Sequence, residues 1–389
     1  MRLYRYGHLL ASWDPGLALL LTLAAAGCAG AQDDAAFPGM EARHTAAFAV
    51  REAGRSRVDS LFTQVTGIDV DSRGRIYAGD WFTARVVVLD STGALIRTLG
   101  RRGLGPGEFR SIRGVQVLPG DSLLVYDPGA ARLSVFAPDS SRAAYVTSLA
   151  SVLRGPEPHL IQRTPANDAH LALLRPPFTT GDTARHDVLR LLNLDGTPRG
   201  EPLRRFPSRS FLRVQGQGGF SVMPNPFGHE GLFALGRDGT LHYAWNDRLG
   251  VESTDLQGRR VGGFTVSYAP PRVTSADAAS AFEGMPEQAV RTFRPALEDS
   301  LPERWPALAA LLADEHGRVW MGLHGPAGEP REWALFEPDG RYVGSAFLPR
   351  NAEVLAARGN RVYAVQTGDD GVTAVVIYQV APRAAGGNG

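Results

Sequence analysis

The feature of this 389-residue sequence that most constrains its fold is an internal repeat of short strands separated by acidic turns. Residues 67–80 read as a strand, a polar turn and a second strand, and residues 85–99 add two more strands around another turn. The segment 239–258 repeats this order, with Asp-Gly before one strand and Asp-Leu-Gln-Gly after the next. Units of about 40 to 50 residues that each hold four short antiparallel strands are typical of propeller blades. The repeat therefore predicts an all-β propeller.

Weaker copies fill the rest of the chain and bring the total to six four-stranded antiparallel blades. We place the starts of the six units near Val65, Ile112, Leu160, Gly231, Leu308 and Val354, with the third and fourth boundaries left open. The last unit supplies only three clear strands, whereas residues 45–51 form an orphan strand ahead of the first unit. An unpaired sheet edge invites aggregation. We therefore expect the orphan strand to close the ring by pairing with the last blade.

One stretch interrupts the strand pattern. Ser275 is a candidate cap of a short helix, Pro286 is a candidate start of a second helix, and Pro295 is its candidate end. We predict a helical insertion over about 273–300, between blades 4 and 5. The propeller is expected to span residues 44–380, and a disordered Gly/Ala tail is expected over 381–389.

The N-terminus has the pattern of an export signal. A positively charged start precedes an apolar run over 16–26, and Ala-Ala-Gly then leads to Cys28, the only cysteine. This order predicts a signal peptide over 1–27, which is too short to span a bilayer stably. The small residues before Cys28 resemble the lipobox of bacterial lipoproteins, which implies lipidation of Cys28. We expect a flexible tether over 28–43 and an outer membrane lipoprotein that faces the periplasm or the cell surface.

The segment 67–109 resembles an NHL repeat. The resemblance rests on Val-Asp-Ser-Arg-Gly-Arg-Ile-Tyr at 70–77 and on Leu-Gly-Arg-Arg-Gly-Leu-Gly-Pro-Gly-Glu-Phe at 99–109. With its lipobox, the whole chain is similar to the poorly characterised six-bladed propeller lipoproteins of environmental bacteria. The resemblance implies the fold and says little about function, because propellers serve as binding modules, lactonases, lyases and scaffolds.

Two candidate metal sites can be weighed from the sequence. The acidic turn over 69–80 has the spacing of a calcium loop, but Arg73 places a cation where an oxygen ligand is required, so turn chemistry explains it better. A zinc centre could be assembled across blades from His170, His229 and His242, although ordinary buried or solvated histidines are the simpler explanation. We predict no metal and no cofactor.

Charge and motifs exclude several classes of function. The 41 basic and 40 acidic residues give a net charge of +1, without the basic footprint of a nucleic-acid-binding protein. The sequence has no G-x-S-x-G elbow, and the glycine run at 103–107 leads into a strand rather than into the helix N-terminus that a phosphate site uses. We predict a monomer with no nucleic-acid partner.

A geometric argument points to one face of the propeller. In a four-stranded blade the loops between the second and third strands share a face with the connections between blades, and we call this the loop face. In the first two blades it collects two aromatic residues, four arginines and an aspartate: Trp81, Phe82, Arg101, Arg102, Arg110, Arg113 and Asp127. Exposed aromatics among arginines are typical of an interface or ligand platform. The alternative is that Trp81 packs between blades and the arginines only solvate an edge.

We therefore favour a binding or scaffolding module for a protein, peptide or glycan of the cell envelope over an enzyme. The alternative is a metal-dependent hydrolase or lyase, as some NHL-like six-bladed propellers are. That activity would need carboxylates or histidines from several blades to converge on one ion at the mouth of the channel.

Overall fold

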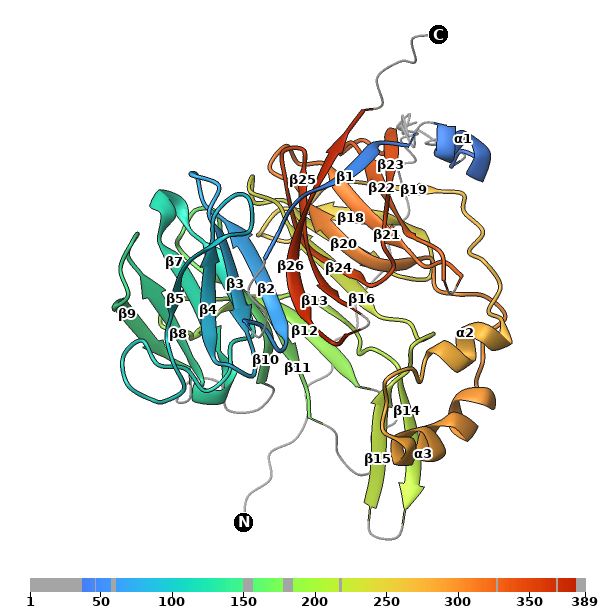
Figure 1. The fold of residues 1–389 in the computed structure, drawn as a ribbon, viewed down its shortest axis with the longest axis horizontal. Coiled ribbons are helices and arrows are strands. Elements are labelled where there is room, and N and C mark those ends of the chain that lie inside the picture. The colour runs from blue at the N-terminus through green and yellow to red at the C-terminus, as the bar shows by residue number, and fades with distance from the viewer. Residues whose placement is uncertain are drawn as a thin grey trace, which may run out of the picture. The chain divides into compact units, whose positions relative to one another are not determined.

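Six four-stranded antiparallel sheets stand around a ring in the computed structural model (Figure 1), which confirms the predicted all-β, six-bladed propeller. The structure describes residues 37–45, 47–56, 61–149, 157–177, 185–216, 219–326, 328–368 and 370–382. The export signal, Cys28 and most of the predicted C-terminal tail lie outside the described residues. No helix in the described part of the chain combines the length and the apolar character needed to cross a membrane.

In blades 1 to 5 the strands follow one another in chain order from the channel outward. Blade 1 consists of β2 (Val65–Val70), β3 (Ile76–Asp80), β4 (Arg85–Leu89) and β5 (Leu95–Leu99). Blade 2 consists of β6 (Gly114–Val117), β7 (Leu123–Asp127), β8 (Arg132–Phe136) and β9 (Ala143–Ser148), with short 3-10 turns η1 (Pro119–Asp121) and η2 (Pro128–Ala130). Blade 3 consists of β10 (Glu157–Arg163), β11 (His170–Arg175), β12 (His186–Leu192) and β13 (Pro198–Pro207).

The other half of the ring repeats the arrangement. Blade 4 consists of β16 (Gly231–Leu235), β17 (Leu241–Trp245), β18 (Leu249–Thr254) and β19 (Arg260–Val266). Blade 5 consists of β20 (Leu308–Ala313), β21 (Val319–Leu323), β22 (Arg331–Phe336) and β23 (Tyr342–Leu348). Blade 6 takes β24 (Ala352–Arg358), β25 (Arg361–Thr367) and β26 (Thr373–Ala381) from the end of the chain.

The N-terminal strand completes the last blade, as the sequence predicted. Strand β1 (Ala49–Arg55) pairs antiparallel with β26, and the sheet order is β1-β26-β25-β24. The strand lies four residues later than the expected segment 45–51, because Met40–Thr45 forms helix α1. The pairing covers an edge of β26 that would otherwise present unpaired backbone groups.

The acidic turn between the first and second strands has the same hydrogen bonds in blades 1 and 5. Asp71 accepts from the backbone N–H groups of Arg73 and Arg75, from the Arg75 side chain, and from the Tyr77 hydroxyl. In blade 5 the same interactions are made by Asp314 with His316, Arg318 and Trp320. The turn also needs a left-handed glycine, at φ +78° for Gly74. The Asp71 carboxylate thus forms its hydrogen bonds to its own turn and the strand that follows, in agreement with the turn chemistry that the sequence predicted for this segment.

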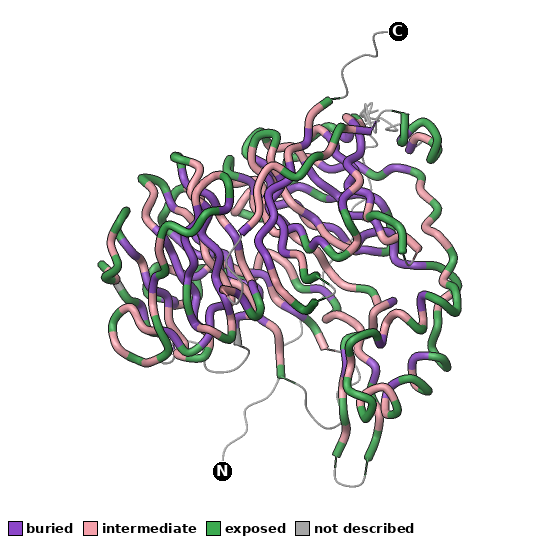
Figure 2. The backbone as a smooth tube through the Cα atoms, in the orientation of Figure 1, coloured by how far each residue is buried: buried purple, intermediate pink, exposed green. Residues whose placement is uncertain are grey.

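The hydrophobic core is divided among the gaps between neighbouring blades. Ile68 and Val87 of blade 1 pack with Val365 of blade 6, and similar clusters of buried aliphatic and aromatic residues fill the other gaps. Figure 2 shows that the buried stretches of chain concentrate in the blade strands. Burial of apolar surface between sheets is the main force that holds such a ring together.

Residues 37–45 pack against blade 5, whereas the sequence predicted a flexible tether over 28–43. Phe37 and Arg43 are both buried. Arg43 forms a two-point ion pair with Glu332, with 2.8 Å from Nε to Oε1, and Ser345 donates to the same carboxylate. The guanidinium also lies over the Phe37 ring at 4.4 Å. The sequence did not reveal this contact because the acid and the arginine are 289 residues apart.

The predicted helical insertion lies between β19 and β20 and contains α2 (Ser275–Ser280) and α3 (Glu287–Glu298). Thr274, rather than Ser275, caps α2 through a reciprocal pair of hydrogen bonds with Asp277. Pro295 lies inside α3 rather than at its end. The helices share a small core with an unpredicted hairpin, β14 (Phe211–Gly216) and β15 (Gly219–Pro224), which extends the connection between blades 3 and 4.

Candidate functional site

Two cavities open along the channel that the innermost strands surround. The first, the turn mouth, lies at the acidic turns between the first and second strands and has a volume of about 400 Å³. The second, the loop mouth, lies on the loop face and has a volume of about 480 Å³. Phe233 of β16 lines both cavities.

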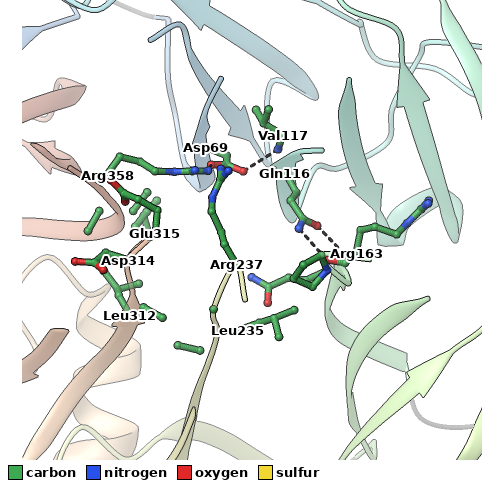
Figure 3. A pocket seen from close by; sticks show the side chains of 18 of the residues that line it. Asp69, Gln116, Val117, Arg163, Leu235, Arg237, Leu312, Asp314, Glu315 and Arg358 are labelled. Atoms are coloured by element: carbon green, nitrogen blue, oxygen red, sulfur yellow. Dashed lines mark hydrogen bonds and ion pairs between the residues drawn. The ribbon is translucent and has the colours of Figure 1, made fainter. Parts of the chain in front are cut away.

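The polar groups of the turn mouth mostly join one blade to the next. Asp69 of blade 1 accepts from the backbone N–H of Val117 in blade 2 at 2.7 Å and pairs with Arg358 of blade 6. The amide of Gln116 both donates to and accepts from the backbone of Arg163 in blade 3, at 2.9 and 2.6 Å (Figure 3). The side chains of Asp69 and Gln116 therefore use their hydrogen bonds to join neighbouring blades.

Other acidic groups at the turn mouth are also bound by groups of the protein itself. Asp314 is buried and bound to Arg318 and Trp320, and Glu315 accepts from the backbone N–H of Gly359 in blade 6. Figure 3 shows the side chain of Arg237 extended from the blade 4 turn toward Asp69. The acidic groups Asp69, Asp314 and Glu315 of this mouth are thus each bound within the fold.

The loop mouth is lined by residues from five blades, and a buried aspartate positions the part that blade 1 contributes. Asp80 ends β3 and accepts from the backbone N–H groups of Thr63 and Gln64, both at 2.7 Å, which ties the start of blade 1 to its second loop. The lining residues are Gln64, Val65, Thr66, Trp81, Arg113, His159, Leu160, Leu173, Arg175, Glu230, Gly231, Leu232, Phe233 and Glu353.

Trp81, Arg113 and His159 form a continuous group on one side of the loop mouth. The Arg113 guanidinium lies over the Trp81 ring, 4.7 Å from its centroid. Nη1 of Arg113 is 2.9 Å from Nδ1 of His159. Arginine is always a donor, so the imidazole nitrogen accepts, and the proton of the neutral ring is on Nε2. The group thus offers both guanidinium and imidazole donors beside an aromatic face.

The environment of His159 keeps it neutral. Burial, together with the smaller effect of the charges of Arg175, Arg113 and Arg209, lowers its pKa from 6.5 to about 3. Arg175 also forms an ion pair with the buried Asp187, 2.9 Å from Nε to Oδ2. His159 is therefore a hydrogen-bonding group of the mouth rather than a charge that titrates near neutral pH.

Two carboxylates face this basic side. Glu230 lies 3.7 Å from Arg209, so its charge is partly compensated. Glu353 follows the first residue of β24 and has no hydrogen-bond or ion-pair partner among the described residues. Burial raises the pKa of Glu353, and the more distant charge of Arg331 opposes this change. The loop mouth therefore holds a carboxylate that the fold itself does not use.

The structure brings two of the seven predicted loop-face residues into the cavity, Trp81 and Arg113. The others lie outside the cavity lining. Phe82 and Arg110 are exposed, and Arg102 donates to the Phe82 carbonyl. Arg101 pairs with Glu108 at the surface.

Asp127, the last of the seven predicted residues, has a structural role on the loop face. It is fully buried and accepts from the backbone N–H groups of Arg110, Ser111 and Ala130 at 2.9 to 3.1 Å. These bonds occupy the carboxylate in the same way as those of Asp80. Asp127 positions the segment that leads to Arg113.

Sequence reasoning missed His159, Arg175, Glu230 and Glu353. Each lies near the loop-face end of an innermost or second strand, at the position in its own blade that corresponds to the surroundings of Trp81 or Arg113. These residues could have been predicted if the exact boundaries of the strands in every blade had been known. The sequence does not define the boundaries of blades 3 and 4, so it does not show which of their residues face the channel.

The described part of the chain has no group of three or more His, Cys, Asp or Glu residues placed to hold a metal ion. His170 is fully buried in blade 3, and His242 is buried in blade 4, where its Nδ1 is 2.9 Å from the Ser253 hydroxyl. His229 lies beside Asn246, with Nδ1 3.2 Å from Oδ1. Within the described residues, the three histidines that the sequence suggested as zinc ligands are therefore not part of a metal-binding group.

The sequence matches no family model and no curated protein. Solved structures with a similar fold include an exported protein of Bacteroides fragilis, at 9% identity and a TM-score of 0.48, over 87% of this chain and 96% of that one. A streptogramin B lyase has 11% identity and a TM-score of 0.42, over 86% and 98%. A calcium-binding regucalcin of Agrobacterium tumefaciens has 13% identity and a TM-score of 0.43, over 85% and 96%. These likenesses concern the fold alone.

Proposed function

We propose that this protein is a binding propeller of the bacterial cell envelope that takes a carboxylate-bearing protein, peptide or glycan ligand at the loop mouth. The observation that carries the proposal is the group formed by Trp81, Arg113 and His159 in a cavity of about 480 Å³. Small-molecule sites are concave, of about 300 to 1,000 Å³, with apolar walls and a few polar groups that fix orientation. The loop mouth has these properties.

The chemistry of the group supports a carboxylate. A guanidinium presents a fixed fork of donors that matches the two oxygens of a carboxylate, and its stacking on an aromatic ring holds the fork in place. The neutral His159 adds a donor without adding a charge. A ligand at the turn mouth, by contrast, would have to displace hydrogen bonds that join the blades.

We place the protein in the envelope because of the leader and Cys28. A lipid on Cys28 would attach the chain to the outer membrane, and the propeller would follow in the chain, with Phe37 the first described residue and buried. The sequence of the leader is the support for this location.

The experiment compares binding of the purified protein to arrays of envelope peptides and glycans. Trp81→Ala and Arg113→Met are expected to weaken binding by about tenfold or more, because central aromatic and arginine residues dominate interface energies. Arg73→Ala is the matched control, since Arg73 is exposed at the acidic turn of blade 1 and its ion pair is with the exposed Asp139. Circular dichroism checks that each variant is folded. Equal loss from both faces, or no loss from either, would contradict the proposal.

Arg102→Ala adds information on ligand size. Arg102 lies on the loop face but outside the cavity lining. A large partner that covers the face would lose affinity with this variant, whereas a ligand confined to the loop mouth would bind as it does to the wild type.

A further inference from the structure

The loop mouth carries opposite charges on opposite sides of the channel. Arg113 comes from blade 2, and His159 and Arg175 come from blade 3. Glu353 comes from blade 6, which faces blade 3 across a ring of six. The cavity is therefore polarised, with its donors on one side and a carboxylate on the other.

Glu353 differs from the other acids around the channel. Asp69, Asp187 and Asp314 are each bound to an arginine, and Glu230 has Arg209 nearby. Glu353 lines the cavity without such a partner among the described residues. Glu353 is exposed at the opening of the cavity, so a cationic group of a ligand that enters the loop mouth can reach its carboxylate and form a charge-assisted hydrogen bond with it.

The same carboxylate argues against a purely anionic ligand. An anion held by Arg113 and His159 would share a cavity of about 480 Å³ with the like charge of Glu353. A ligand that carries both an ammonium and a carboxylate would satisfy both sides. The apolar side chains of Val65, Leu160, Leu173 and Leu232 line the space between them.

We propose that the loop mouth binds a small zwitterion, an amino acid or a short peptide with free ends, with its carboxylate on Arg113 and His159 and its ammonium group on Glu353. The inference rests on the proposed function, which it narrows to one class of ligand. The carboxylate accepts from the Arg113 fork and from the Nε2–H of His159. The ammonium group donates to Glu353 from the opposite side.

Isothermal titration calorimetry with glycine peptides of one to four residues tests the proposal on the wild-type protein. Each peptide is used with free ends, with an acetylated N-terminus and with an amidated C-terminus. We expect one length to bind best with free ends and each blocked form to bind about tenfold more weakly or worse, because each block removes one charge-assisted interaction. This comparison needs no variant and does not depend on the folding of one.

Two variants test which side of the loop mouth binds the ammonium group of the ligand and which side binds its carboxylate. Glu353→Gln, which keeps the size of the side chain, should abolish the difference between the free and the acetylated peptide and keep the difference between the free and the amidated one. Arg113→Met should do the reverse. Melting temperatures of both variants are measured to confirm that they are folded.

The outcomes separate this inference from the proposed function. If acetylated peptides bind as tightly as free ones, or if no glycine peptide binds at millimolar concentration, the zwitterion inference is wrong, and the array experiment with Trp81→Ala and Arg113→Met still decides the proposed function. If the peptides bind but neither Trp81→Ala nor Arg113→Met weakens them, both proposals are wrong.

Discussion

Nη1 of Arg113 is 2.9 Å from Nδ1 of His159, and this hydrogen bond links blade 2 to blade 3 at the loop mouth. It fixes the guanidinium over the Trp81 ring and leaves the Nε2–H of the imidazole as a donor. One side of the channel mouth is thus organised before any ligand arrives. Such preorganisation lowers the entropic cost of binding.

Asp127 is predicted to act on stability rather than on binding directly. Asp127→Ala leaves three backbone N–H groups without their acceptor, which should lower the free energy of unfolding by about 2 to 4 kcal/mol. Urea unfolding followed by circular dichroism measures the change. The exposed neighbour Arg110 provides the control, because Arg110→Ala should change stability by less than about 0.5 kcal/mol. A stable Asp127→Ala protein that fails to bind would instead make Asp127 a ligand contact.

The ion pair between Arg43 and Glu332 is predicted to fasten the N-terminal segment to blade 5. Arg43→Met leaves Glu332 buried with Ser345 as its remaining donor, and breaking a buried pair in this way costs about 3 kcal/mol or more. The exposed pair of Arg291 and Glu287 is the comparison, and Arg291→Met should cost less than about 0.5 kcal/mol. Equal effects of the two variants on thermal unfolding would contradict the prediction that this ion pair fastens the segment to blade 5.

The fold could be predicted from the sequence because its signals are local. The acidic turn at Asp71 recurs at Asp314 with the same hydrogen bonds, and each turn marks the step from the first to the second strand. The closing strand could be inferred from a missing partner in the last blade. Strand β1 and helix α1 were still displaced from expectation, because the contact that orders residues 37–45 is made by Glu332, far away in the chain.

The candidate site was harder to predict from the sequence because its residues come from five blades that are far apart in the chain. Trp81 and Arg113 could be found, since the repeat in blades 1 and 2 is regular enough to place them on a face. His159 and Glu353 lie just before Leu160 and Val354, where blades 3 and 6 were expected to start, whereas the innermost strands already begin at Glu157 and Ala352. The contact between neighbouring blades that pairs Arg113 with His159 leaves no mark in a single sequence.

Acid is predicted to destabilise the protein through its buried histidines. Burial, and to a smaller extent the charge of Arg163, lowers the pKa of His170 from 6.5 to about 4. The unfolded chain then takes up the proton first, so stability present above pH 6.5 is lost as the pH falls toward 4. Between pH 7 and 4.5 this amounts to roughly 2 kcal/mol for His170.

Urea unfolding at the two pH values checks the prediction. The wild type should lose more stability on acidification than His170→Gln, whose side chain does not titrate. His159 and His324, whose pKa values are both lowered to about 3, act in the same direction and leave a residual slope in the variant. An identical pH dependence for the two proteins would contradict the assignment to His170.

Lipidation of Cys28 is predicted from the leader. The mature chain should begin at Cys28, carry a lipid and partition into detergent, whereas Cys28→Ala should remain unlipidated and stay in the aqueous phase. Mass spectrometry of the mature N-terminus measures both. An unmodified Cys28, or cleavage at another position, would remove the basis for the envelope location.

Hydrogen exchange of the backbone amides, with and without the tightest ligand found on the arrays, tests most directly that the loop mouth is the binding site. The account predicts slower exchange on ligand binding around Gln64 to Thr66, Trp81, Arg113 and His159, which border the loop mouth. The segments 116–119, 162–165 and 235–237, which border the turn mouth, should be unchanged. Protection confined to those segments, with none at Trp81 and Arg113, would contradict it.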